Sequence, residues 1–226
     1  MTTQWTAIGT VDRSLSTQVY DFLRERIISG DLKPGQRLIE REICEQLNVS
    51  RIPLREALPQ LEADGFIRTL PRRGAMVTQL TLRDIEELFD VRESLEVLAA
   101  KLAAGNPDPA GLAVLAENIR EARAALDRGA DHEAAAANVA FHDGVLALSR
   151  NALLAGLMQP LNGRMQWLFR MTADRDIRVQ CAEHEGLFAA IRDGNTELAA
   201  SLAFAHVASG RTPSLTLLAD VLPADR

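Results

Sequence analysis

Apolar residues in the first third of the chain recur at steps of three and four, the spacing typical of amphipathic helices. We expect three helices there, over residues 15–30, 40–47 and 51–63. Asn48 suits the C-terminal end of the second helix because it tolerates a left-handed backbone, and Ser50 offers a hydroxyl cap to the third. After Gly65 the helical spacing stops, and residues 66–69 and 75–78 are expected to form two short strands around a basic turn.

From residue 81 onward the pattern predicts helices alone. Thr81 and Asp84 resemble a capping box with Asp in place of Glu or Gln, and Pro160 is expected to kink the helix that contains it. The six expected helices cover residues 82–104, 109–127, 132–149, 152–173, 177–193 and 196–209. Short turns between them favour an antiparallel bundle. No element is assigned to the last fifteen or so residues.

The composition agrees with a mainly α protein, because aromatic residues make up only 4% of the 226 residues while alanine and leucine abound. The two cysteines, Cys44 and Cys181, exclude a disulfide framework and a cysteine-rich zinc module. No apolar run approaches the length of a membrane span, and the N-terminal decamer lacks the features of a signal peptide. We therefore expect a cytoplasmic protein with no membrane partner.

The formal net charge of −6, taken over the whole chain, argues against a nucleic-acid partner. The charge is, however, divided unevenly along the chain. Residues 1–80 hold 11 basic and 10 acidic side chains, whereas residues 81–226 hold 14 and 21. The near-neutral first part and the acidic second part favour two domains, over residues 13–80 and 81–226.

Three helices followed by a hairpin are the outline of a winged helix-turn-helix, and the arginines suit DNA. Arg51 and Arg55 are four apart on one face of the third helix, Arg41 begins the second helix, and Arg72 and Arg73 lie in the basic turn. Guanidinium groups can pair with phosphates or with the guanine edge. The alternative is that these arginines are solvated and paired with the nearby glutamates.

Pro59 is unusual because it lies inside the predicted third helix, where it removes a backbone hydrogen bond to the carbonyl of Arg55. A kink or an early loosening of the helix after Arg55 is therefore expected.

The histidines carry the candidate chemistry of the second part. Asn138 and His142 share one face of a predicted helix, and His184 and His206 lie on apolar faces of two others. Imidazoles that meet in a bundle core can hold a divalent metal, whereas a single histidine on an apolar face is more often an ordinary core residue. Spacing alone leaves both alternatives open.

Residues 27–78 resemble the DNA-binding domain of the GntR family of bacterial transcription regulators. The matching positions are Gly30, Pro34-Gly35-x-x-Leu38, Glu40-Arg41, Ser50-Arg51-x-Pro53, Arg55-Glu56-Ala57-Leu58, Leu61, Gly65 and Arg73-Gly74. The resemblance implies that Arg41, Arg51 and Arg55 contact operator DNA and that Ser50 caps the recognition helix and touches a phosphate. It also implies that Gly74, at the wing tip, lies in or beside the minor groove, and the adjacent Arg73 is expected to bind DNA.

The second part is similar to the FCD ligand-binding domain of one GntR subfamily. The matching positions are Val91-Arg92-x-x-Leu95-Glu96, Asn138-x-x-Phe141-His142, Glu183-His184 and His206. The resemblance implies a divalent metal, with zinc or nickel expected, held by Asn138, His142, His184 and His206. This chain has Asn138 where the family more often has Asp, and a neutral amide oxygen is the weaker ligand.

A small carboxylate metabolite is the effector that the FCD resemblance implies, and Arg92 is the expected cation for it. The leading hypothesis is a homodimeric, ligand-responsive transcription factor that is not an enzyme. The alternatives are a metal-dependent enzyme with a three-histidine site and a metalloregulator in which the metal is the signal. No general base is placed for an enzyme, since Asp143 and Glu183 adjoin histidines in sequence but are expected to point elsewhere.

Overall fold

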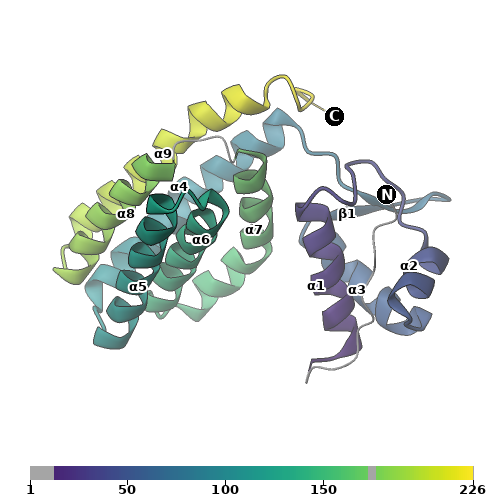
Figure 1. The fold of residues 1–226 in the computed structure, drawn as a ribbon, viewed down its shortest axis with the longest axis horizontal. Helices are drawn as coiled ribbons and strands as arrows, with labels where there is room; N and C mark the ends of the chain where they lie inside the picture. The colour runs from purple at the N-terminus through teal and green to yellow at the C-terminus, as the bar shows by residue number, and fades with distance from the viewer. Residues whose placement is uncertain (1–12, 173–176, 226) are drawn as a thin grey trace. The chain divides into compact units, whose positions relative to one another are not determined.

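The computed structural model describes residues 13–172 and 177–225, so the N-terminal decamer and the expected helix end at Ala173 lie outside it. Within those ranges the protein is mainly α, with nine helices and one two-stranded antiparallel sheet (Figure 1). The described residues divide into two compact units, of which the first contains residues 13–80 and 160–170 and the second contains residues 81–159, 171–172 and 177–225.

The first unit is a winged helix-turn-helix, as the pattern predicted. Its elements are α1 (Leu15–Ile28), α2 (Glu40–Leu47), α3 (Arg51–Ala63), β1 (Ile67–Leu70) and β2 (Gly74–Val77). Helices α1 and α3 pack together through leucine, isoleucine and valine side chains that recur every three or four residues and are fully buried. Asn48 ends α2 in the left-handed conformation expected of it, with φ +52°.

The wing contains backbone pairing that the sequence did not indicate. Strand β1 pairs with β2 so that Ile67 faces Val77 and Leu70 faces Gly74. The segment after Pro34, expected only as a turn, runs along β2, where the Leu38 amide donates to the Ala75 carbonyl at 2.8 Å. The far edge of β2 is thereby covered, which protects an otherwise unpaired strand edge.

The second unit is a helical bundle. Its helices are α4 (Leu82–Gly105), α5 (Pro109–Asp127), α6 (Asp131–Leu148), α7 (Ala152–Met171, only in part), α8 (Ile177–Arg192) and α9 (Thr196–Leu218). The main pairings are α4 with α9, α5 with α6, and α8 with α9. Alanines fill much of this core and let the helices approach closely, which accounts for the low aromatic content.

The start of α4 was predicted correctly from local signals, whereas the predicted end of α9 was wrong. The hydroxyl of Thr81 accepts from the amide of Asp84 at 3.1 Å, and the Asp84 carboxylate accepts from the amide of Thr81 at 2.9 Å, which confirms the capping box. The expected end of α9 near residue 209 was too early, because the helix continues through Pro213 to Leu218. The chain after α9 then bonds the first turn of α4, where the Leu82 amide donates to the Pro223 carbonyl at 2.8 Å.

The expectation that α3 loosens after Arg55 is wrong, because α3 continues through Pro59 to Ala63. Pro59 lies on the exposed side of α3 and is not part of the buried core. Buried Leu54, Ala57 and Leu61 hold the helix against its neighbours on both sides of the proline. Packing therefore offsets the hydrogen bond that Pro59 lacks.

Replacing Pro59 with alanine should restore the amide that can donate to the Arg55 carbonyl. We expect the P59A variant to gain about 1–3 kcal/mol in free energy of unfolding, measured by urea denaturation. Gln60→Ala, at the neighbouring exposed position, should stay within about 0.5 kcal/mol of the wild type. A P59A protein no more stable than the Q60A control would contradict this account of α3.

Candidate functional site

The exposed face of the helix-turn-helix gathers the predicted DNA-binding residues. Arg51 and Arg55 lie on α3, Arg41 lies on α2, and all three side chains are exposed. Arg55 is ion-paired with Glu40 at 3.0 Å and Arg41 with Glu45 at 3.3 Å. The glutamate pairing foreseen as the alternative is thus present for two of the arginines, and exposed pairs of this kind contribute little stability.

Ser50 and the wing tip complete this face. Ser50 occupies the N-cap position of α3, but its side chain makes no capping hydrogen bond, so the expected cap is wrong in that detail. Arg72 and Gly74 have positive φ, +65° and +76°, which turns the chain sharply between the strands. Arg73 lies between them and is exposed.

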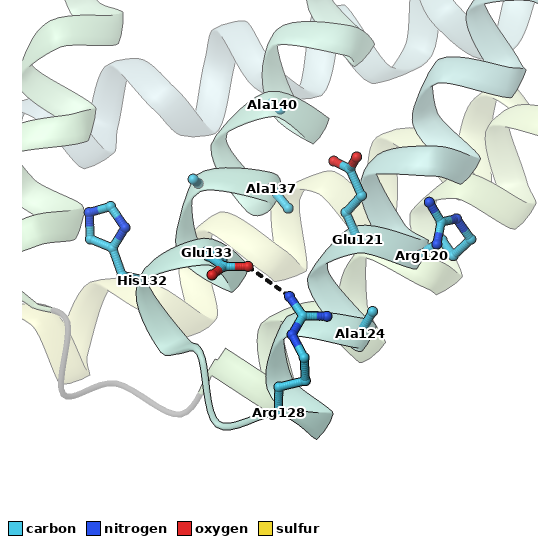
Figure 2. A pocket seen from close by; sticks show the side chains of 9 residues that line it. Arg120, Glu121, Ala124, Arg128, His132, Glu133, Ala137 and Ala140 are labelled. Atoms are coloured by element: carbon cyan, nitrogen blue, oxygen red, sulfur yellow. Dashed lines mark hydrogen bonds and ion pairs between the residues drawn. The ribbon is translucent and has the colours of Figure 1, made fainter.

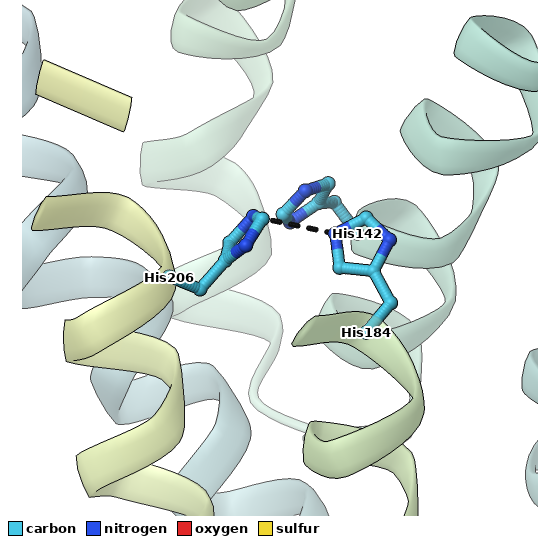
Figure 3. Close-up of side chains that lie close together, drawn as sticks. All are labelled: His142, His184 and His206. Carbon is cyan, nitrogen blue, oxygen red and sulfur yellow. Dashed lines mark hydrogen bonds between the residues drawn. The ribbon is translucent and has the colours of Figure 1, made fainter. Parts of the chain in front are cut away.

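Three histidines from three helices meet inside the second unit. His142 lies on α6, His184 on α8 and His206 on α9, and their candidate ligand atoms all lie within 4.8 Å of one another (Figure 3). The Nε2 atoms of His184 and His206 are 3.2 Å apart. His184 is 1% exposed and His206 is 8% exposed, so the cluster is largely closed to solvent.

Burial favours the neutral forms of His184 and His206 in this cluster. It holds the pKa of His184 well below its ordinary value, and it also lowers the pKa of His206 against the opposing effect of Glu183. A neutral imidazole has one nitrogen lone pair available for a metal. The ring of Phe141 stacks on His184 with centroids 4.5 Å apart, which fixes the plane of that ring.

Two glutamate carboxylates lie against the Nδ1 atoms of two of the histidines. Nδ1 of His206 lies 2.7 Å from the Glu183 carboxylate, and Nδ1 of His142 lies 3.2 Å from that of Glu96. The expectation that Glu183 points away from the site is therefore wrong. Glu183 contacts His206, which comes from α9 and not from its own helix.

Arg92, the expected effector-binding cation, is buried and paired within its own helix. Its Nε donates to Glu96 at 2.6 Å, one turn further along α4, and its side chain is 3% exposed. Burial by itself raises the pKa of the Glu96 carboxyl, but the charge of Arg92 and the hydrogen bonds from Arg92 and His142 hold it well below its usual range. The carboxylate is therefore ionised.

Asn138, the fourth expected ligand, is buried one turn before His142. The Cys181 thiol donates to its Oδ1 at 3.5 Å, and its Nδ2 has no hydrogen-bond partner among the described residues. An amide is placed by its hydrogen bonds, and rotating it by half a turn would exchange the oxygen and the nitrogen. The buried donor without a partner marks this amide as one that a further group could satisfy.

A separate pocket of about 560 Å³ lies between α5 and α6, and no sequence pattern indicated it (Figure 2). Alanines form much of its lining, with Arg120, Arg128 and the exposed His132 among the other lining residues. Arg128 is paired with Glu133 at 2.7 Å, and Arg120 is paired with Glu117. The pocket is lined by none of the three clustered histidines.

Comparison with known proteins assigns the chain to a family. Residues 15–77 match the GntR family of bacterial regulatory proteins, and residues 87–209, more than half of the chain, match the FCD domain. This chain is a GntR-family transcriptional regulator with an FCD domain. The regulator thus combines a DNA-binding helix-turn-helix with an effector-binding domain, and its relatives are regulators and not enzymes.

Individual relatives match this regulator over most of its length. An HTH-type transcriptional regulator of Bacillus subtilis, YdhC, is 31% identical over 192 residues, which cover 84% of this chain and 86% of that protein. The solved structure of Escherichia coli McbR/YncC has a TM-score of 0.75 with 26% identity and covers 88% of this chain and 95% of its own. A GntR regulator from Rhodococcus sp. RHA1 has a TM-score of 0.74 with 28% identity and covers 90% and 99%.

None of the helices in the described ranges combines the length and the hydropathy that a membrane span requires.

Removing one partner of the Arg92–Glu96 pair should destabilise the protein much more than removing one partner of an exposed pair of the same spacing. Glu96→Gln leaves the buried guanidinium facing a neutral amide, and we expect a loss of about 3 kcal/mol in free energy of unfolding, measured by chemical denaturation. Glu87→Gln removes the exposed partner of Arg83 on the same helix, again at i,i+4, and should cost less than about 1 kcal/mol. Equal losses of unfolding free energy in the two variants would contradict this account of the buried Arg92–Glu96 pair.

Proposed function

We propose that this regulator binds operator DNA through residues 13–80 and senses a small carboxylate metabolite at a metal centre within residues 81–226. The observation that carries the proposal is the buried cluster of His142, His184 and His206, in a chain whose other unit is a winged helix-turn-helix.

Operator recognition is assigned to the exposed face of the first unit. Arg41, Arg51 and Arg55 would pair with phosphates or base edges, and Ser50 would meet a phosphate at the N-terminus of α3. Arg73 and Gly74 would bring the wing to the minor groove. The exposed pairs Arg55–Glu40 and Arg41–Glu45 support this assignment, because a phosphate can replace a glutamate at small cost.

The donor set at the histidine cluster fits a divalent ion. Three largely buried imidazoles, two of them with lowered pKa, suit zinc or nickel better than calcium or magnesium, which prefer oxygen ligands. Asn138 would supply a fourth ligand after its amide rotates, and the partnerless Nδ2 supports this role. A bound ion would supply positive charge and open coordination positions for a carboxylate oxygen.

Arg92 would add positive charge beside the effector. Because it is already paired with Glu96, an effector carboxylate would share or displace that partner rather than meet a solvated cation. Effector binding would then change operator affinity only as far as the effector prefers one packing of the regulator over another. We further propose a homodimer, which would place two recognition helices on two half-sites.

Arginine substitutions on α3 test the DNA interface. Arg51→Ala and Arg55→Ala should each weaken binding about 10- to 100-fold, because each removes a charged contact to DNA. The measurement is fluorescence anisotropy, using a duplex that the wild-type protein selects from a random pool. Arg83→Ala, an exposed arginine of α4, is the matched control and should bind as the wild type does. Wild-type affinity for the duplex in both α3 variants would contradict the proposed DNA interface.

A histidine substitution tests the metal centre. Chelator-treated wild-type protein should take up one zinc or nickel ion per chain, and His142→Ala should lose more than about 100-fold in affinity, since it removes a ligand itself. His132→Ala is the control, because His132 lies on the same helix but is exposed. Chelator competition followed by elemental analysis measures both. Metal affinity that is the same in H142A and the wild type would exclude His142 as a ligand.

A further inference from the structure

Each of two histidines in the cluster has a glutamate at Nδ1, and each glutamate comes from a different helix than its histidine. Glu183 of α8 faces His206 of α9 at 2.7 Å, and Glu96 of α4 faces His142 of α6 at 3.2 Å. The glutamates are themselves held in place. The Ser209 hydroxyl donates to Glu183 at 3.0 Å, and Arg92 donates to Glu96 at 2.6 Å.

We propose that Glu183 and Glu96 are positioning residues that hold His206 and His142 in the Nδ1–H tautomer and so direct both Nε2 lone pairs into the cluster. This inference rests on the proposed metal centre, and it adds two residues that do not touch the ion.

The argument follows from the donors and acceptors present. An ionised carboxylate only accepts hydrogen bonds, so the ring nitrogen facing it must carry the proton. In a neutral imidazole the other nitrogen then carries the lone pair. For His206 that nitrogen is Nε2, which lies 3.2 Å from Nε2 of His184.

The tautomer of His184 follows from that of His206. Because the close contact between their Nε2 atoms needs one donor, and His206 offers a lone pair there, His184 must carry its proton on Nε2 when no metal is bound. Coordination through Nε2 of His184 would move that proton to Nδ1 of the same ring, so the ring stays neutral. His206 and His142 need no such shift, since the glutamates have already placed their protons.

Carboxylates that accept from ligand histidines have a measurable effect on metal binding. Such partners fix the ring orientation and increase the basicity of the ligating nitrogen, and their loss typically lowers affinity 10- to 100-fold. Glu183 is the better test residue, because its side chain is 27% exposed, whereas Glu96 also neutralises the buried Arg92.

Three variants on α8 of the full-length protein separate positioning from simple helix packing. Glu183→Ala removes the acceptor, Glu183→Gln keeps a neutral acceptor without the charge, and Glu185→Gln is the control. Glu185 lies on the same helix and is ion-paired with Arg123 at 2.6 Å. Zinc affinity is measured by competition with a chromophoric chelator, and the tautomers are read from long-range ¹H–¹⁵N NMR spectra of chelator-treated protein.

We expect wild-type protein to show His206 as the Nδ1–H tautomer and His184 as the Nε2–H tautomer. Glu183→Ala should mix the two forms at His206 and lower zinc affinity about 10- to 100-fold. Glu183→Gln should keep the His206 tautomer with a smaller loss of affinity, and Glu185→Gln should match the wild type. If Glu183→Ala fails to fold, the wild-type tautomers and the zinc affinity of Glu183→Gln still decide whether Glu183 positions His206.

An unchanged Nδ1–H tautomer at His206 in Glu183→Ala would overturn the inference, as would wild-type zinc affinity in both Glu183 variants. Failure of the wild-type protein to bind zinc or nickel would instead remove the proposed metal centre. The tautomers of chelator-treated protein would still test the positioning of His206, because that spectrum needs no metal.

Discussion

The second unit depends on bringing three imidazoles together at one largely buried point. Protonating His184 or His206 would place a poorly solvated positive charge beside two other rings, so burial lowers the pKa of both. The rings come from α6, α8 and α9, and α4 contributes Glu96 to the same group. Four helices are thus tied to one small polar centre, which makes the packing of the bundle and the geometry of the proposed site inseparable.

The two units use arginine–glutamate pairs in opposite ways. Arg55 and Glu40 meet at an exposed surface, where water solvates both charges and the pair is worth little. A phosphate can take the place of the glutamate there. Arg92 and Glu96 meet inside the bundle, where neither charge has an alternative solvent. The first pair therefore suits reversible binding of a polyanion, whereas removing one partner of the second leaves a buried charge unpaired.

Most signals that act within one turn of the chain were reliable predictors, although the Ser50 side chain does not make the expected capping hydrogen bond. Asn48 ends α2, and Thr81 with Asp84 begins α4, because each effect is confined to neighbouring backbone groups. Signals that depend on distant packing failed. Pro59 does not end α3, since buried side chains on both sides hold the helix, and the segment after Pro34 becomes a partner of β2 only when the wing folds beside it.

The sequence by itself determined the helical periodicities, the hairpin with its basic turn, the uneven charge of the two parts, and three histidines on three predicted helices. Only the tertiary structure decided that those histidines meet, that Glu183 lies against Nδ1 of His206, and that Arg92 forms a buried ion pair with Glu96. The physical reason is that periodicity shows which face of a helix is buried. The identity of the helix opposite that face follows from packing between segments distant in sequence.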